Sequence, residues 1–120
     1  TYCRLVRKHS MKDYSPIVQK AIVLIESDLS ANLSLSSISA SQSVSAGYLS
    51  TVFKNETGKT VTEYIREKRM KHAAHLLSTT FLQIQTVALH CGIMDVQYFS
   101  KTFKKYMGMT PKEYRDSTKE

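Results

Sequence analysis

Residues 48–64 read YLSTVFKNETGKTVTEY and residues 98–114 read YFSKTFKKYMGMTPKEY, so the chain carries nearly the same segment twice. The two copies begin fifty residues apart, and eight of their seventeen aligned positions are identical. The identical pairs are Tyr48/Tyr98, Ser50/Ser100, Phe53/Phe103, Lys54/Lys104, Gly58/Gly108, Thr60/Thr110, Glu63/Glu113 and Tyr64/Tyr114. A repeat of this length indicates one supersecondary unit used twice. The function of the protein must therefore account for both copies.

The sequence around the repeat is typical of helices. Only four Gly and two Pro interrupt the 120 residues, and apolar residues recur mostly at spacings of three and four, as on a helical face. Helix starts and stops recur at matching places: N-caps at Ser45 and Asp95, terminating glycines at Gly58 and Gly108, and capping boxes at Thr60–Glu63 and Thr110–Glu113. Each unit therefore reads as a short helix, a turn of three or four residues and a longer helix, which is a helix-turn-helix.

We expect an all-α fold of about seven helices, with two helix-turn-helix subdomains joined by a long linker helix. The expected boundaries are 1–14 for the tail of an interdomain connection, 15–60 for the first subdomain, 61–79 for the linker helix and 80–120 for the second subdomain. Ser15 and Pro16 predict the cap and first turn of an opening helix. Its buried stripe would consist of Val18, Ala21, Ile22, Ile25 and Leu29.

The charge balance favours a polyanionic partner. Seventeen Lys and Arg against ten Asp and Glu give a formal net charge of +7, which favours nucleic acid first and an acidic membrane surface second. Ordinary solubility charge is the alternative. Cys3 and Cys91 are too few and too far apart for a disulfide framework, which favours reduced thiols in the cytoplasm. We find no signal peptide and no apolar run of the roughly 20 residues that a spanning helix needs.

A helix-turn-helix places its second helix in the major groove of DNA, where the base edges are distinguishable. One such helix contacts few base pairs, and paired half-sites lie about 34–36 Å apart. A linker helix of about 18 residues spans roughly 27 Å. The units at its ends would add to this length and place the two groove-binding helices about one DNA turn apart. We therefore expect two recognition helices, at about 45–57 and 95–107, in successive major-groove segments.

Three segments carry a family resemblance: YLSTVFKNETG, AAHLLSTT and VALHCGIMDVQYFSKTFKKYMGMTPKEYR. They and their order resemble the DNA-binding domain of AraC/XylS-family bacterial transcription regulators over about residues 16–116. The resemblance implies a transcription regulator, either an activator or a repressor, that binds double-stranded DNA and contacts RNA polymerase. No cofactor is expected. It also implies an N-terminal sensing, dimerisation or receiver domain, with TYCRLVRKHSMK as the tail of the connection. Ser39 and Gln42 depart from the family's apolar pattern, so we expect the first unit to be the less stable half.

The residues that face away from the expected cores are the candidates for DNA contact. The candidate base-reading residues are Ala46, Gly47, Ser50 and Thr51 in the first unit and Val96, Gln97, Ser100 and Lys101 in the second. The candidate phosphate-binding residues are Ser45, Lys54, Arg66, Lys104 and Lys105. Gln97 can bond bidentately to adenine, and Lys101 can donate to guanine. Gly47 offers nothing to a base, so specificity should depend mainly on the second unit. An ordinary solvated face is the alternative for each residue.

Other side chains have simpler interpretations. The cluster of Arg66, Lys68, Arg69 and Lys71 would meet phosphates or form a solvated face. The repeated aromatic residues Tyr48, Phe53, Tyr64, Phe99, Phe103 and Tyr114 are expected to pack in the cores. His72, His75 and His90 lack the further ligands that zinc needs, and no grouping is typical of an enzyme.

Two other functions remain open. The first is a basic helical protein-interaction module that meets an acidic partner, and the second is binding to an anionic membrane surface. Neither of them requires two copies of the unit separated by one DNA turn, so the internal repeat favours DNA binding.

Overall fold

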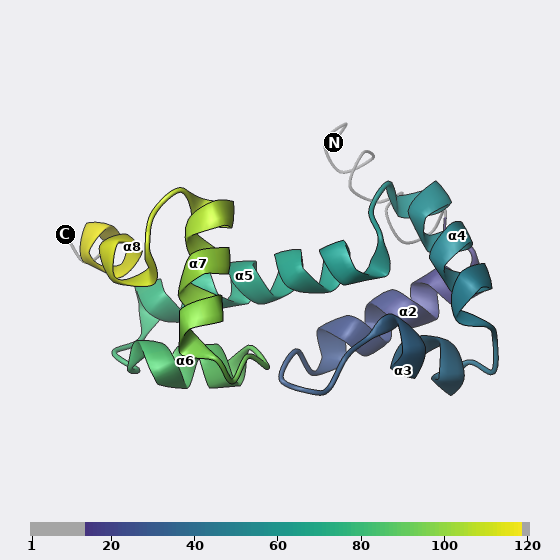
Figure 1. Ribbon diagram of the computed structural model, residues 1–120, viewed down its shortest axis with the longest axis horizontal. Coiled ribbons are helices and arrows are strands. Elements are labelled where there is room, and N and C mark those ends of the chain that lie inside the picture. Colours follow the sequence, from purple (N-terminus) through teal and green to yellow (C-terminus); the bar gives the residue numbers. More distant parts are fainter. Residues whose placement is uncertain (1–13, 119–120) are drawn as a thin grey trace, which may run out of the picture. The chain divides into compact units, whose positions relative to one another are not determined.

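A computed structural model describes residues 14–118 of the chain. Within that range the chain folds into seven helices and no strand (Figure 1), which confirms the expected all-α fold. The helices are α2 (Pro16–Ser27), α3 (Leu35–Ser41), α4 (Ala46–Thr57), α5 (Val61–Thr79), α6 (Ile84–His90), α7 (Val96–Met107) and α8 (Pro111–Thr118). Apart from Tyr14, the expected interdomain tail lies outside the described residues.

The helices belong to two compact units. Unit 1 contains α2, α3, α4 and the first three residues of α5, and unit 2 contains segment 28–32, the rest of α5, and α6 to α8. The core of unit 1 is built where α2 and α3 pack on α4. Its fully buried side chains include Val18, Ile25, Ile38, Leu49 and Phe53.

The start and end of α2 differ in detail from the sequence prediction. The helix begins at Pro16, and the carbonyl oxygen of Ser15 accepts from the backbone N–H groups of Val18 and Gln19. The Ser15 hydroxyl is buried without a hydrogen-bond partner, so the predicted side-chain cap is wrong. The helix ends at Ser27, before Leu29. Leu29 therefore belongs to segment 28–32 of unit 2 and not to the α2 stripe.

Unit 1 anchors its unusual polar residues by hydrogen bonds. Ser34 and Ser37 form a reciprocal capping box at the start of α3. Ser39 is 4% exposed, and its hydroxyl donates to the carbonyl oxygen of Ser36. The side-chain amide of Gln42 donates to the carbonyl oxygen of Ile17, 3.1 Å away. These bonds satisfy the polar groups, yet they do not replace the apolar contacts that a fully apolar core would supply.

We expect amide exchange to be about tenfold faster in residues 34–55 than in residues 84–107 of the free protein. Buried Ser39 occupies the place of buried Ala88, because the N–H of Val44 bonds to Ser39 as that of Ile93 bonds to Ala88. A buried hydroxyl carries a desolvation cost that a methyl group lacks. Residue-resolved exchange measured by NMR checks this difference, and equal protection of the two ranges would contradict it.

The core of unit 2 is centred on α5, α6 and α7. The rings of Phe99 and Phe103 are fully buried with their centroids 5.9 Å apart, and Tyr114 of α8 meets Phe103 edge-on at 5.5 Å. Between α6 and α7 the turn has five residues, 91–95, against four residues, 42–45, between α3 and α4. The second turn is thus longer than predicted. Met94, at its tip, is 87% exposed.

Segment 28–32 is held in unit 2 by Arg69 of α5. The guanidinium donates from Nε to the carbonyl oxygen of Leu29 at 3.0 Å and from Nη2 to that of Ala31 at 2.8 Å. Gly92 lies against the same place, because a Cβ there would come within 2.6 Å of the Leu29 carbonyl oxygen. The planar fork of an arginine suits two acceptors at once. Arg69, Gly92 and Leu29 therefore form one packed junction.

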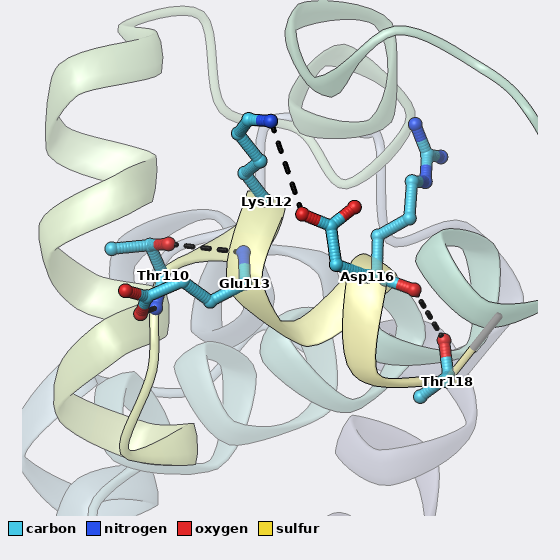
Figure 2. Close-up of polar contacts among 6 residues, drawn as sticks. Thr110, Lys112, Glu113, Asp116 and Thr118 are labelled. Carbon is cyan, nitrogen blue, oxygen red and sulfur yellow. Dashed lines mark hydrogen bonds and ion pairs between the residues drawn. The ribbon is translucent and has the colours of Figure 1, made fainter. Parts of the chain in front are cut away.

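The last helix is fixed by a capping box and by an arginine. The hydroxyl of Thr110 accepts from the N–H of Glu113, the Glu113 carboxylate accepts from the N–H of Thr110, and Lys112 pairs with Asp116 (Figure 2). Arg115 donates from Nε to the carbonyl oxygen of Leu77 in α5. These bonds orient α8 within unit 2. The capping boxes at Thr60 and Thr110 are both confirmed.

Candidate nucleic-acid interface

Helices α4 and α7 are matched in length and in the way they begin and end. Each has 12 residues. The hydroxyl of Ser45 accepts from the N–H of Tyr48, and the carboxylate of Asp95 accepts from those of Gln97 and Tyr98. Both helices end at a left-handed glycine, at Gly58 and Gly108. Helices α4 and α7 therefore match in length and in the positions of their caps.

The core sides of the two helices fix which residues face outward. Leu49 and Phe53 are buried in α4, and Phe99, Thr102 and Phe103 are buried in α7. Residues advance by about 100° each around a helix axis, which places Gly47, Thr51, Gln97 and Lys101 on the side away from these buried groups. Ser50 and Ser100 lie about 100° from Leu49 and Phe99, whereas Ala46 and Val96 lie about 20° from Phe53 and Phe103. Of the predicted residues, Gly47, Thr51, Gln97 and Lys101 are exposed, and Ala46, Ser50, Val96 and Ser100 are half-buried.

The predicted phosphate-binding residues differ in their surroundings. Lys54, Lys104 and Lys105 are exposed, whereas Arg66 on α5 is half-buried. Ser45 is exposed, and its hydroxyl oxygen already accepts the bond that caps α4. Hydrogen bonds from Thr110, with a smaller contribution from the charge of Lys104, lower the pKa of Glu113.

The basic cluster of α5 does not form one uniform surface. Arg69 is half-buried and bonded to two carbonyl oxygens, so it is neither a free phosphate ligand nor part of a solvated face. Burial lowers the pKa of Arg69, and its neighbours Cys91 and Tyr98 act in the opposite direction. Lys71 pairs with Glu67 at 3.1 Å, and the ammonium of Lys68 lies 5.4 Å from the ring centroid of Tyr64.

Two exposed tyrosines depart from what the sequence predicts. Tyr48 was predicted to pack in the core, but its side chain is 55% exposed, and Tyr98 at the matching place is 50% exposed. Each lies about 100° around the helix from the buried residue that follows it, Leu49 or Phe99. The angular position could have revealed their exposure, had it been given more weight than their aromatic character.

The described residues hold no group of three or more His, Cys, Asp and Glu side chains that could bind a metal ion. Burial, and then the nearby charges of His75 and His90, lower the pKa of His72. Burial raises the pKa of Cys91 to about 12, so its thiol stays protonated at neutral pH. Among residues 14–118, no helix combines the length and apolar character needed to span a bilayer.

Comparisons with known sequences agree with this architecture. A family model described as a helix-turn-helix domain matches residues 38–117. The HTH-type transcriptional activator AarP of Providencia stuartii is 38% identical over 109 residues, which are 91% of this chain and 80% of AarP. The HTH-type transcriptional activator RhaR of an Enterobacter strain is 33% identical over 88% of this chain. The chain spans 38% of the length of that RhaR.

Solved structures share the fold. The C-terminal domain of AraT, a response regulator from Geobacillus stearothermophilus, is 38% identical, with a TM-score of 0.84 and 86% of each chain covered. The DNA-binding domain of AdpA, in complex with a target DNA, is 21% identical, with a TM-score of 0.78 and coverage of 86% of this chain and 92% of that one. At that identity, the AdpA likeness concerns the fold alone.

Proposed function

Since this chain belongs to the AraC-type helix-turn-helix family of DNA-binding transcription regulators, we propose that α4 and α7 are its two recognition helices. Each would enter one of two successive major-groove segments of the same duplex. The observation that carries this proposal is the pair of equal, capped helices, each with an outward face opposite its buried residues. A major groove admits one helix of this kind at a time.

The length of α5 supports the use of both helices on one duplex. It has 19 residues, which at 1.5 Å each extend about 28 Å. Successive half-sites on one face of DNA are about 34–36 Å apart. A helix of this length is a suitable connection between two units that read adjacent turns.

The two helices would contribute unequally to sequence recognition. Gln97 and Lys101 of α7 are exposed and carry groups that match adenine and guanine edges. At the same places α4 has Gly47 and Thr51, and glycine offers no side chain. A Cβ at Gly47 would meet no atom within 4 Å, so the packing of unit 1 does not require a glycine there. We assign most base discrimination to α7 and mainly positioning to α4.

Phosphate contacts would come from the exposed lysines at the ends of these helices. Lys54, Lys104 and Lys105 lie in the last turns of α4 and α7, and Arg66 and Ser45 complete the proposed set. Such contacts fix the orientation of the protein on DNA and supply affinity that depends on salt.

Binding to random duplex fragments across a series of salt concentrations tests the function. If about 6–8 phosphates are neutralised, the logarithm of the association constant should fall against that of the salt concentration with a slope of about −5 to −7. A gel shift or fluorescence anisotropy series measures the slope. Absence of binding at about 50 mM salt, or a flat slope, would instead favour the alternative of a basic module for an acidic protein partner.

The proposal extends to the larger regulatory setting. AarP and RhaR are described as activators, which supports contact with RNA polymerase as a further proposal. The greater length of RhaR fits a sensing or receiver domain in the same protein. Access to DNA would place the protein in the cytoplasm of a bacterium.

A further inference from the structure

Two exposed tyrosines occupy the same place on α4 and α7. Tyr48 and Tyr98 are each the third residue of their helix and are 55% and 50% exposed. The other repeated rings of these helices, Phe53 and Phe103, are fully buried. One exposed ring on a surface is common and needs no explanation. The same exposed ring in both copies of a repeated unit indicates a shared task for the two helices.

The position of each tyrosine around its helix identifies the part of the groove it would meet. At about 100° per residue, Tyr98 lies about 60° from Lys101, which is near the middle of the outward face. It lies about 20° from Lys105 and about 160° from Ser100, on the other edge of that face. Tyr48 has the same relation to Thr51 and Ser50.

A helix in the major groove directs the middle of its face at base edges and the two sides of that face at the two backbones. The groove is about 12 Å wide, and a helix with its side chains is about 10–12 Å across. A tyrosine at the edge of the face therefore meets the wall of the groove. Its phenolic hydroxyl can donate to a phosphate oxygen while the ring covers a deoxyribose.

We propose that Tyr48 and Tyr98 each bind a backbone phosphate at the same edge of their groove. The inference rests on the proposed insertion of α4 and α7 into DNA and adds two contacts to the residues assigned above. In α7 the same edge also carries exposed Lys105, about 10 Å further along the helix axis. In α4 the residue corresponding to Lys105 is Asn55, so this edge of α4 carries Tyr48 without a matching lysine.

A phenol contact has two properties that separate it from the lysine and base contacts. The hydroxyl is neutral, so its contact with a phosphate releases no counterion on binding. Loss of the hydroxyl therefore leaves the salt dependence of binding unchanged. A phosphate contact is independent of base sequence, so its loss weakens specific and random DNA equally. Loss of a lysine contact instead lowers the salt slope by about one.

The test replaces each tyrosine with phenylalanine in the whole chain, which removes the hydroxyl and keeps the ring. Affinities for a selected high-affinity duplex and for a random duplex are measured at three salt concentrations. Tyr48→Phe and Tyr98→Phe should each weaken both duplexes about fivefold, and the double variant about 25-fold, with an unchanged slope. Lys105→Met should lower the slope by about one.

Tyr106→Phe is the matched control. Tyr106 is also an exposed tyrosine of α7, at 39%. It lies about 20° from buried Phe99 around the axis and in the last turn of the helix. Its variant should bind like the parent chain. Amide exchange confirms that all of these variants remain folded.

Unchanged affinity in both tyrosine variants would overturn the inference, and so would a loss confined to the selected duplex, since the phenol would then read bases. If the parent chain binds with a steep slope while the variants match it, only the tyrosine inference fails. If the parent chain binds no duplex, the proposed function fails and the tyrosine inference falls with it.

Discussion

Gly92→Ala should destabilise unit 2 by about 3 kcal/mol, since three unfavourable effects combine at one residue. Gly92 has φ +80°, a backbone conformation that costs a side-chain-bearing residue about 1–2 kcal/mol. The new Cβ would lie 2.6 Å from the carbonyl oxygen of Leu29 and 2.9 Å from Nη2 of Arg69. Relief of that overlap moves the guanidinium away from the carbonyl oxygens it binds, which weakens or breaks the charge-assisted hydrogen bonds between them.

Gly108→Ala separates the backbone effect from the packing effect. Gly108 has nearly the same backbone angle, φ +83°, but a Cβ there would meet no atom within 4 Å. We expect a cost of about 1 kcal/mol, from backbone strain alone. The comparison uses amide exchange of α6 and α7 at increasing urea concentration, which reports on unit 2 specifically. Equal losses for the two variants would show that the junction of Arg69, Gly92 and Leu29 contributes nothing.

Local signals predicted most of the fold correctly. The caps at Ser45 and Asp95 and the glycines that end α4 and α7 operate within a few residues of chain, so their physical cause is visible in the sequence. The repeat then supplied the order of the elements. The bounds of α4 and α7 followed from these signals to within about one residue.

Features that depend on distant contacts were not predicted. The sequence around Arg69 predicts an exposed cation on α5. Its actual partners, the carbonyl oxygens of Leu29 and Ala31, lie 40 and 38 residues away in the sequence. No periodic pattern marks a bond between a side chain and a remote backbone. The Ser15 hydroxyl lacks its expected bond, and Tyr48 was assigned to the core because aromatic character outweighed its angular position.

The candidate interface was predicted as a helical face, and the outward positions follow from the spacing of the buried residues. The bases and phosphates that each side chain would contact depend on how the helix lies in the groove, which the sequence of the protein does not encode locally. The assignments of Gln97, Lys101 and their counterparts in α4 therefore stay predictions, to be measured on DNA.

Gln97→Ala and Lys101→Ala should each reduce the preference for a selected duplex over a random one by about tenfold to 100-fold. A side chain that bonds a base edge contributes about 1–3 kcal/mol of discrimination. Ser50→Ala and Thr51→Ala should each reduce it by less than about threefold, because short hydroxyl side chains on a positioning helix make weaker or less selective contacts. The measured quantity is the ratio of the two dissociation constants at one salt concentration.

Lys104→Met serves as the control, because it removes a positive charge without removing a contact to a base edge. This exposed residue of α7 is assigned to a phosphate, so its variant should weaken both duplexes alike and lower the salt slope by about one, with the ratio preserved. A larger fall in the ratio for Ser50→Ala or Thr51→Ala than for the α7 variants would reverse the proposed division of labour. Since Gly47 offers no side chain to a base, the discrimination of α4 would then have to come from those two hydroxyl groups and from the shape of the DNA.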